Sequence, residues 1–220
     1  MSTGDAFFDQ LSSRRSVREF TAEPVTRAQL ERLLAAAVTA PSATNRQPWR
    51  FTVVTDAARR EAVVGAVRRR TEEMKAVIAG SRHGAEFEGY GDFFFEPLAS
   101  APAIIVPQYR VYPDAIAHMI ASAGDDPTRF TTPAAMPSEI CATSAAVMLI
   151  LAQAHADGLG ACWMAGPTVA RDELADLLDI REPWRMLGAI AVGRPAGDAR
   201  PKPARKPLDR IAIFVDEENP

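Results

Sequence analysis

Two short segments of the chain carry side chains that suit the binding of a small anionic ligand. The first is Arg14-Arg15-Ser16-Val17-Arg18. An extended backbone would place residues 14, 16 and 18 on one side, because side chains alternate along a strand. Two guanidinium groups and a hydroxyl on that side could bind a phosphate. The same residues are also typical of the basic C-terminus of a helix.

The second segment is a polar loop framed by two prolines, Pro41-Ser42-Ala43-Thr44-Asn45-Arg46-Gln47-Pro48. Asn45 and Gln47 carry carboxamides, which both donate and accept hydrogen bonds, as the edge of a flat heterocycle requires. An Asx-type turn with incidental polar residues is the alternative interpretation.

Basic residues gather near both ends of a chain whose net charge is -3 and whose pI is about 5.7. This balance argues against general nucleic-acid binding and against a polybasic membrane contact. Two local clusters favour a small anionic ligand, with solvated surface as the alternative. The cluster near the end consists of Arg200, Lys202, Arg205, Lys206 and Arg210.

The two segments, read with two later ones, resemble a known family. RRSVREF followed by PSATNRQPWRF resembles the opening of the FMN-dependent nitroreductase family. GLGACWMAGP (158–167) is similar to the family's second flavin segment, and ARKPLDRI (204–211) to its C-terminal phosphate-contacting arm. The four segments occur in the family's order and leave out the middle of the chain, about 56–137.

The resemblance implies an FMN-binding site. It assigns the phosphate and ribityl end to Arg14, Arg15, Ser16 and Arg18, with Arg205 and Lys206 returning to the phosphate. It assigns the other wall of the flavin, contributed by the partner subunit, to Pro41, Ser42, Asn45 and Gln47. Ala165 and Gly166 would supply backbone N–H groups near flavin N5 and O4. Some relatives carry an acidic residue where this chain has Ala165, so only the backbone can act there.

The resemblance further implies an intertwined homodimer with two FMN sites at its interface. In the implied reaction, hydride passes from NAD(P)H through flavin N5 to a small acceptor such as a nitroaromatic, a quinone or an activated alkene. Because the cofactor carries out this transfer, no acid/base triad is needed. Two other functions remain open: an FMN-dependent oxidase or dehydrogenase of a biosynthetic pathway, and a non-catalytic flavin-binding protein.

Other motifs are weaker. Gly158-Leu-Gly160 is not a dinucleotide fingerprint, and no Walker A sequence occurs. The three histidines, His83, His118 and His155, lack the spacing of metal ligands. Arg68–Arg70 are predicted to be a solvated helix end rather than a nicotinamide-phosphate clamp. Phe93–Phe95 suit either packing or a substrate lid.

The elements that must position these residues alternate between helix and strand, which predicts an α/β or α+β class. The resemblance to the nitroreductase family implies the α+β form, with a mostly antiparallel central sheet flanked by helices. Thr26 and Gln29 have capping-box spacing, and Val25 and Leu30 a staple spacing, at the start of a helix that ends before Pro41. Further helices are predicted at 56–78, 138–157 (the longest) and 169–178. Strands are predicted at 49–54, 102–106, 161–164, 187–192 and, after a proline-rich arm (194–206), at 210–215. Residues 80–97 are predicted to be a loop or lid, and 123–137 turns.

The 220 residues, 47% of them hydrophobic, are enough for a single domain spanning 1–220. Cys141 and Cys162 lie in apolar stretches and are predicted to be buried and reduced. The N-terminus lacks the apolar region of a signal peptide. The longest apolar run, Ala145–Ala152, is far short of the roughly 20 residues that span a bilayer. A cytoplasmic protein is expected.

Overall fold

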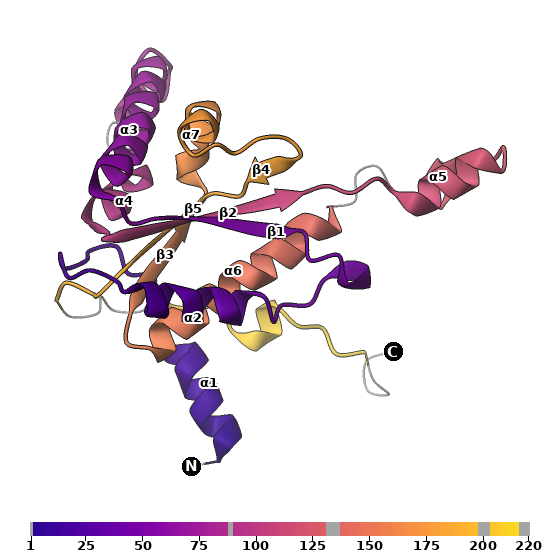
Figure 1. Cartoon of the computed structure of the whole chain (residues 1–220), viewed down its shortest axis with the longest axis horizontal. Helices are drawn as coiled ribbons and strands as arrows, with labels where there is room; N and C mark the ends of the chain where they lie inside the picture. Colours follow the sequence, from indigo (N-terminus) through magenta and orange to yellow (C-terminus); the bar gives the residue numbers. More distant parts are fainter. Residues whose placement is uncertain (1, 88–89, 131–136, 198–202, 216–220) are drawn as a thin grey trace.

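A computed structural model describes residues 2–87, 90–130, 137–197 and 203–215. Its centre is an antiparallel sheet in the order β1-β2-β5-β3 (Figure 1). A short strand, β4, pairs with the far end of β2, beyond the part that pairs with β5. The strands are β1 (Trp49–Val54), β2 (Ala103–Arg110), β3 (Gly160–Met164), β4 (Trp184–Met186) and β5 (Ala189–Gly193). The predicted α+β class is confirmed.

Helices cover both faces of the sheet, and strand β2, buried from Ala103 to Gln108, contributes to both cores. Ile104 and Val106 of β2 pack with α3 (Ala57–Ala79), α4 (Glu96–Ser100) and α7 (Arg171–Leu177). Ala103 and Ile105 face the other way, towards α2 (Arg27–Ala37) and α6 (Ser138–Ala156). This alternation follows from the two-residue period of a strand.

The start of α2 is as predicted. The Thr26 hydroxyl accepts a hydrogen bond from the Gln29 backbone, the Gln29 side chain accepts one from the Thr26 backbone, and Val25 and Leu30 are buried. The helix predicted at 56–78 is α3, whose 23 residues exceed the 19 of α6. The expectation that 138–157 is the longest helix was therefore wrong.

Four helices and strands had no sequence prediction: β4, α1 (Thr3–Ser13), α4 and α5 (Ala115–Ser122). Ser2 and Asp5 form a capping box on α1, and Asp114 caps α5. Neither helix has a buried residue. Both project from the body of the molecule (Figure 1), so their apolar side chains, such as Phe7 and Phe8 of α1 and Ile116 of α5, are exposed instead of packed on the core.

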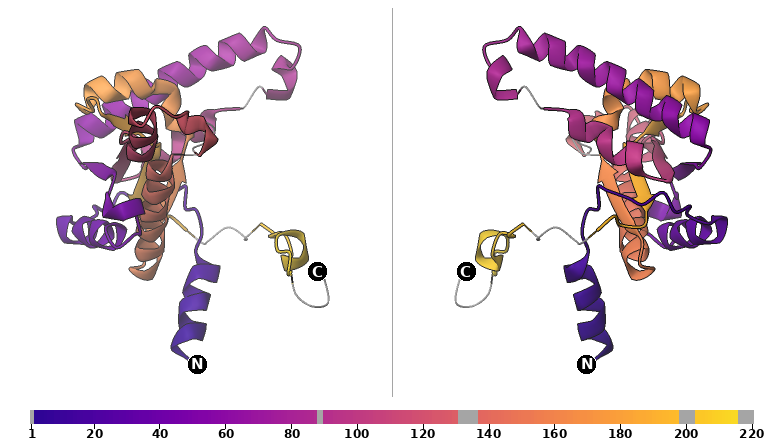
Figure 2. Two further views of the ribbon diagram at one scale, coloured as in Figure 1. Left: turned by 90° about the vertical axis from the view of Figure 1, so that its right-hand side faces the viewer. Right: turned by 90° about the vertical axis from the view of Figure 1, so that its left-hand side faces the viewer.

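The strand predicted at 210–215 is wrong. Residues 203–215 contain a short 3-10 helix, η6 (Leu208–Arg210), followed by irregular chain in which Ile213 is 92% exposed. Figure 2 shows this segment standing away from the body. The arm begins in the sheet region, where Thr21 N donates to Arg194 O and Ala196 N to Glu19 O. Apolar β-forming residues become a strand only beside a partner edge, and within the described chain 210–215 has none.

The apolar helix α6 is long enough, and with a mean hydropathy of 1.4 apolar enough, to cross a membrane by length and composition alone. Its buried residues pack against α2 and the sheet, which explains its apolarity. Cys141 lies on the outer side of this helix and is exposed, so the prediction that it is buried was wrong. Cys162 of β3 is buried, and both thiols are free.

Candidate functional site

The segment 14–18 lies extended along β3, at the outer edge of the sheet. We call this segment the basic edge. Ser16 forms a parallel bridge with Ala161 of β3, and Val17 N donates to Ala161 O at 3.1 Å. Val17 faces the protein and covers Gly160, where a Cβ atom would lie only 2.7 Å from the Val17 side chain. Ser16 and Arg18 are consequently exposed. The extended arrangement is confirmed, although Arg14 also forms the C-cap of α1.

Arg14 and Arg18 flank Ser16, which pairs with Ala161 of β3. Burial raises the pKa of the Cys162 thiol, and the positive charges of Arg18 and Arg14 act against that rise, so both guanidinium groups lie near this strand. Nη1 of Arg14 is buried and has no hydrogen-bond partner among the described residues. A buried donor without an acceptor costs about 1–3 kcal/mol. The basic edge therefore fits the phosphate of a cofactor such as FMN, whose oxygens would accept from that donor.

One end of the Arg15 guanidinium is used by α1, while its Nε is buried and has no partner among the described residues. Its Nη1 donates to the backbone oxygens of Ser13 (2.6 Å), Arg14 (3.1 Å) and Ser12 (3.3 Å), which belong to the last turn of α1 and the residue after it. A positive charge at this C-terminal end also interacts favourably with the dipole of the helix. In this conformation Arg15 fixes the end of α1.

His155, near the end of α6, anchors α1 from the other side. Its Nε2 lies 2.9 Å from Ser13 Oγ. Burial, and then the charges of Arg14 and Arg15, lower the pKa of His155 below its usual 6.5. As the pH falls below about 6.5, the unfolded chain takes up this proton before the folded chain does. The stability that neutral His155 contributes to the folded protein above about pH 6.5 is therefore lost as the pH falls.

We therefore expect the melting temperature of the ligand-free protein to fall between pH 7 and 5. His155→Gln, which keeps a polar group beside Ser13, should flatten that part of the profile. His118→Gln on the exposed helix α5 is the control and should follow the wild type. An unchanged slope in His155→Gln would show that His155 does not govern the pH dependence.

The proline-framed loop has a specific backbone conformation. Around η1 (Ala43–Asn45), three residues that are not glycine have positive φ: Thr44 (51°), Asn45 (54°) and Gln47 (46°). Such conformations cost of order 1–3 kcal/mol each and persist only where the surroundings hold them. Gln47 N donates to Ser42 Oγ at 3.0 Å, and Gln47 Nε2 donates to Asn45 Oδ1 at 3.1 Å. The two carboxamides are thus side by side and exposed.

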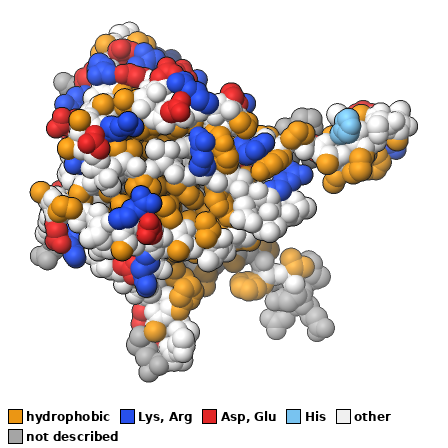
Figure 3. Space-filling model, viewed as in Figure 1, with side chains coloured by type: hydrophobic (Ala, Val, Ile, Leu, Met, Phe, Trp, Pro, Cys, Tyr) orange, Lys and Arg blue, Asp and Glu red, His pale blue; other side chains and the backbone are white. Residues whose placement is uncertain are grey.

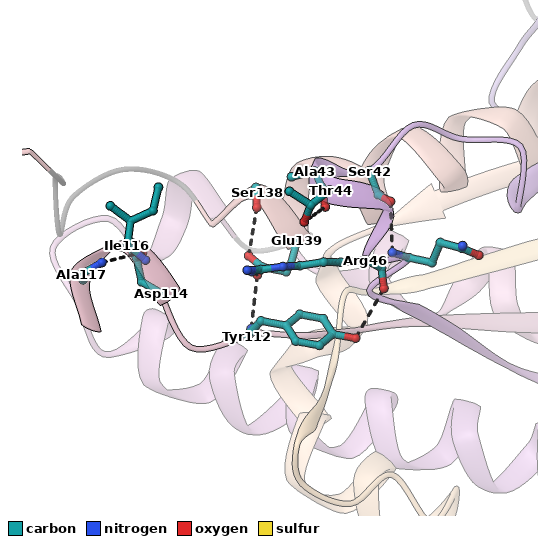
Figure 4. Close-up of polar contacts among 11 residues, drawn as sticks. Ser42, Ala43, Thr44, Arg46, Tyr112, Asp114, Ile116, Ala117, Ser138 and Glu139 are labelled. Carbon is teal, nitrogen blue, oxygen red and sulfur yellow. Dashed lines mark hydrogen bonds and ion pairs between the residues drawn. The ribbon is translucent and has the colours of Figure 1, made fainter. Parts of the chain in front are cut away.

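Contacts from outside the loop hold it in place (Figure 4). Arg46 pairs with Glu139 at 3.5 Å, and the hydroxyl of Tyr112 donates to Arg46 O at 3.4 Å. Glu139 also accepts from Tyr112 N at 3.2 Å and is only 5% exposed. Sequence reasoning missed Glu139 and Tyr112, since neither belongs to a motif and both act only through the fold.

The basic edge and the loop lie at opposite ends of α6. His155, in the last turn of α6, contacts Ser13, the residue before the basic edge, and Glu139, in the first turn, contacts Arg46 of the loop. At 1.5 Å per residue these positions are about 24 Å apart. One chain therefore does not bring both segments around a single small ligand, and a site that uses both needs two copies of the chain.

Ala165 and Gly166 follow β3 directly and begin η5 (Gly166–Ala170). Phe94 packs so tightly on Gly166 that a Cβ atom there would overlap its ring. Phe94 is 8% exposed and makes edge contacts with Phe93 and Tyr90. The aromatic run thus serves packing through Phe94, whereas Phe93 and Tyr90 remain exposed. It lies in η3 (Asp92–Phe94), within a segment of short helices that also includes η2 (Gly84–Phe87).

Other sequence-predicted residues lie apart from this region. Arg205 and Lys206 are exposed on the segment that stands away from the body (Figure 2). Within the described ranges no three His, Cys, Asp or Glu side chains form a metal-binding group. Arg69 and Arg70 form exposed ion pairs with Glu173 and Glu73. These arginines are solvated, but they lie inside α3 rather than at its end.

A cavity of about 260 Å³ lies between α3 and α4. None of the sequence-predicted site residues lines it. Its lining residues are Arg60, Glu61, Val64, Gly65, Arg68, Leu98 and Ala99.

Comparison with known proteins matches this arrangement to one family. A family model described as the Nitroreductase family matches residues 11–194. A 5,6-dimethylbenzimidazole synthase of Rhodospirillum rubrum is 29% identical over 183 residues, which cover 83% of this chain and 78% of that protein. An NADH dehydrogenase of Thermus thermophilus is 28% identical over 208 residues, covering 91% and 92%.

Solved structures share the fold. A BluB-like flavoprotein from Clostridium difficile 630 superposes with a TM-score of 0.83 at 20% identity, covering 98% of this chain and 100% of that one. A nitroreductase in complex with FMN from Desulfovibrio desulfuricans has a TM-score of 0.64 at 23% identity, covering 96% of each chain. These similarities confirm the fold that the sequence predicts.

Proposed function

Since the chain belongs to the nitroreductase family, we propose that it is an FMN-dependent oxidoreductase whose two FMN sites are each shared between two copies of the chain. The observation that carries the proposal is the separation of two complementary half-sites. The basic edge lies at one end of α6, with an unpartnered buried donor on Arg14. The exposed carboxamides of Asn45 and Gln47 lie at the other end.

In this proposal Arg14, Ser16 and Arg18 bind the FMN phosphate through charge-assisted and neutral hydrogen bonds. Arg205 and Lys206 of the C-terminal segment add positive charge to the same group. When bound, FMN supplies the hydride chemistry at N5.

The ring system is held by backbone and by a second chain. The backbone at Ala165 and Gly166, held in place by Phe94, would orient the flavin near N5 and O4. The loop of the second copy, with Pro41, Ser42, Asn45 and Gln47, would contact the edge of the ring. Because that loop keeps its shape through internal hydrogen bonds, little ordering is needed when the flavin binds.

Exposed apolar side chains on the projecting segments support a dimer. Phe7 and Phe8 of α1 are 65% and 68% exposed, and Phe214 of the C-terminal segment is 72% exposed. Large apolar surface of this kind marks an interaction site in soluble proteins. A second copy would bury it and bring the two half-sites together.

For the reaction, we propose that NAD(P)H reduces the flavin and that a small acceptor, a nitroaromatic, a quinone or an activated alkene, then takes the hydride. The similarity to an NADH dehydrogenase supports this direction. The similarity to a 5,6-dimethylbenzimidazole synthase supports a second candidate, an FMN-dependent oxidase or dehydrogenase of a biosynthetic pathway. A non-catalytic flavin-binding protein is the third.

The purified protein is expected to be yellow, with about one noncovalent FMN per chain, and to lose its flavin absorbance when NAD(P)H is added without oxygen. Chromatography of the heat-released supernatant identifies the flavin. FAD, or no flavin after reconstitution, would contradict the proposal. Turnover in air without NAD(P)H would favour the oxidase, and FMN that NAD(P)H cannot bleach would favour the non-catalytic protein.

Arg14→Ala should weaken FMN binding by about 1.5–3 kcal/mol, the usual contribution of a hydrogen bond to a charged group. Titration of the apoprotein with FMN, followed by flavin fluorescence, measures this change as a rise in Kd of roughly ten- to a hundredfold. Arg69→Ala is the control, because its guanidinium is exposed and already pairs with Glu173 of α7. Equal affinity in both variants would place the phosphate elsewhere.

A further inference from the structure

Five side chains next to the loop alternate between arginine and an aromatic ring, and we call them the cation–aromatic row. In order, they are Arg46, Tyr112, Arg110, Trp184 and Arg50. Cζ of Arg46 and of Arg110 lie 5.2 and 4.6 Å from the centre of the Tyr112 ring. Cζ of Arg110 and of Arg50 lie 5.9 and 4.8 Å from that of Trp184.

The row stands on one face of the sheet. Arg50 pairs with Gln108 across β1 and β2, and Arg110 pairs with Trp184 across β2 and β4. This is the face of Ile104 and Val106, beyond the end of the core that those residues form with α3. Figure 3 shows arginine and lysine side chains interspersed with hydrophobic ones on this side of the body, towards α5.

The head group of Arg50 is held in a fixed position. Arg50 Nε donates to Gln108 Oε1 at 2.7 Å, and Gln108 Nε2 donates to Thr52 Oγ1 at 2.7 Å. Gln108 is fully buried, so this orientation is set from inside the sheet. Such preorganisation lowers the entropy lost when a ligand binds.

The charges of the row are not balanced. Glu139 pairs with Arg46, but among the described residues Arg50 and Arg110 have no carboxylate partner. Nε of Arg110 is buried and has no acceptor there. The aromatic faces offset part of the repulsion between neighbouring guanidinium groups, but they do not accept the buried N–H. An anion placed at Arg110 and Arg50 would balance their positive charges and accept a hydrogen bond from the buried N–H of Arg110.

We propose that Arg50 and Arg110 bind the anionic group, a phosphate or a carboxylate, of the substrate that exchanges hydride with the flavin. The inference rests on the proposed function, because the row begins at Arg46, between the two carboxamides that would contact the flavin. A substrate with its reactive end at the ring would extend its charged end along β1 and β2. Trp184 and Tyr112 offer flat surfaces on which a planar group can stack.

The experiment uses the FMN-loaded protein with Arg50→Met, Arg110→Met and the double variant. The control is Arg185→Met: Arg185 pairs with Tyr109 on the same strands, its side chain on the opposite face of β4. Steady-state constants are measured with NADPH, NADH and the uncharged donor 1-benzyl-1,4-dihydronicotinamide, with an uncharged quinone as acceptor. A second series, with the uncharged donor, compares 4-nitrobenzoate with nitrobenzene as acceptor.

We expect KM for one anionic substrate to rise at least tenfold in each single variant, with kcat and the constants of the uncharged counterpart unchanged. A rise with the nicotinamide nucleotides identifies the phosphates of the donor, and a rise with 4-nitrobenzoate a carboxylate of the acceptor. Arg110→Lys, which keeps the charge, should recover part of the effect. Constants that change equally for charged and uncharged substrates, or not at all, would overturn the inference.

The flavin spectrum separates this result from the proposed function. A variant that keeps FMN and is bleached by the uncharged donor, yet shows wild-type KM for every anionic substrate, refutes the anion site alone. A wild-type protein that binds no FMN refutes the proposed function itself.

Discussion

Deleting residues 200–220 is expected to leave a monomer without FMN. The described part of this region exposes five apolar side chains, which a free monomer would present to water: Leu208, Ile211, Ile213, Phe214 and Val215. A partner chain would cover them, and apolar burial contributes about 25 cal/mol per Å². The same deletion removes Arg205 and Lys206 from the proposed phosphate site. Dimerisation and flavin binding should therefore be lost together.

Light scattering and flavin content, measured on the same sample, test this expectation. The matched control is Arg205→Ala combined with Lys206→Ala in the full chain, which removes the charges and keeps the apolar residues. It should weaken FMN binding and remain a dimer. A truncated chain that is stable, monomeric and yellow would refute the shared-site architecture, though not the flavin chemistry.

Gly166→Ala is expected to abolish FMN retention and to lower stability. The new methyl group would overlap the ring of Phe94, which is buried in the core with Leu98 and cannot move aside cheaply. Overpacking of this kind typically costs 1–3 kcal/mol. The backbone at 165–167 is the part that can shift, and that shift would displace the N–H groups proposed to face flavin N5.

Urea unfolding gives the loss of stability, and the flavin-to-protein absorbance ratio gives the loss of cofactor. Gly80→Ala is the control, since φ is -77° there and the nearest atom to an added Cβ is 3.6 Å away. Phe94→Ala added to Gly166→Ala should restore part of the FMN binding, because it vacates the space that the methyl group needs. Wild-type flavin content in Gly166→Ala would show that the segment is not in contact with the cofactor.

The sequence predicts those parts of the fold that local chemistry determines. The capping box at Thr26, the strand Trp49–Val54 and the positive φ of Gly158 after α6 all follow from neighbouring residues. The strand expected at 210–215 fails because strand formation requires a partner edge, which local sequence does not report.

The candidate site also contains residues that local sequence marks and residues that only the fold brings to it. The basic edge and the loop are contiguous in sequence, so their residues could be named before the structure was known. Glu139 and Tyr112, which hold the loop, lie about 90 and 65 residues away from it, and nothing in their neighbourhoods marks them. Arg15 combines both cases: its Nη1 is used by the end of α1, whereas its Nε is buried and has no partner among the described residues, so the ligand contact that the motif predicts for it stays a prediction.

The length of α6 also has a genetic consequence. If each flavin takes its phosphate contacts from one chain and its carboxamide loop from the other, then damage to the two half-sites falls on different alleles independently. A cell that expresses one chain lacking Arg14 and another lacking Asn45 would assemble mixed dimers with one site defective twice and the other intact. Two alleles that are each inactive alone would then restore partial activity together, because a helix about 28 Å long keeps their defects at opposite ends.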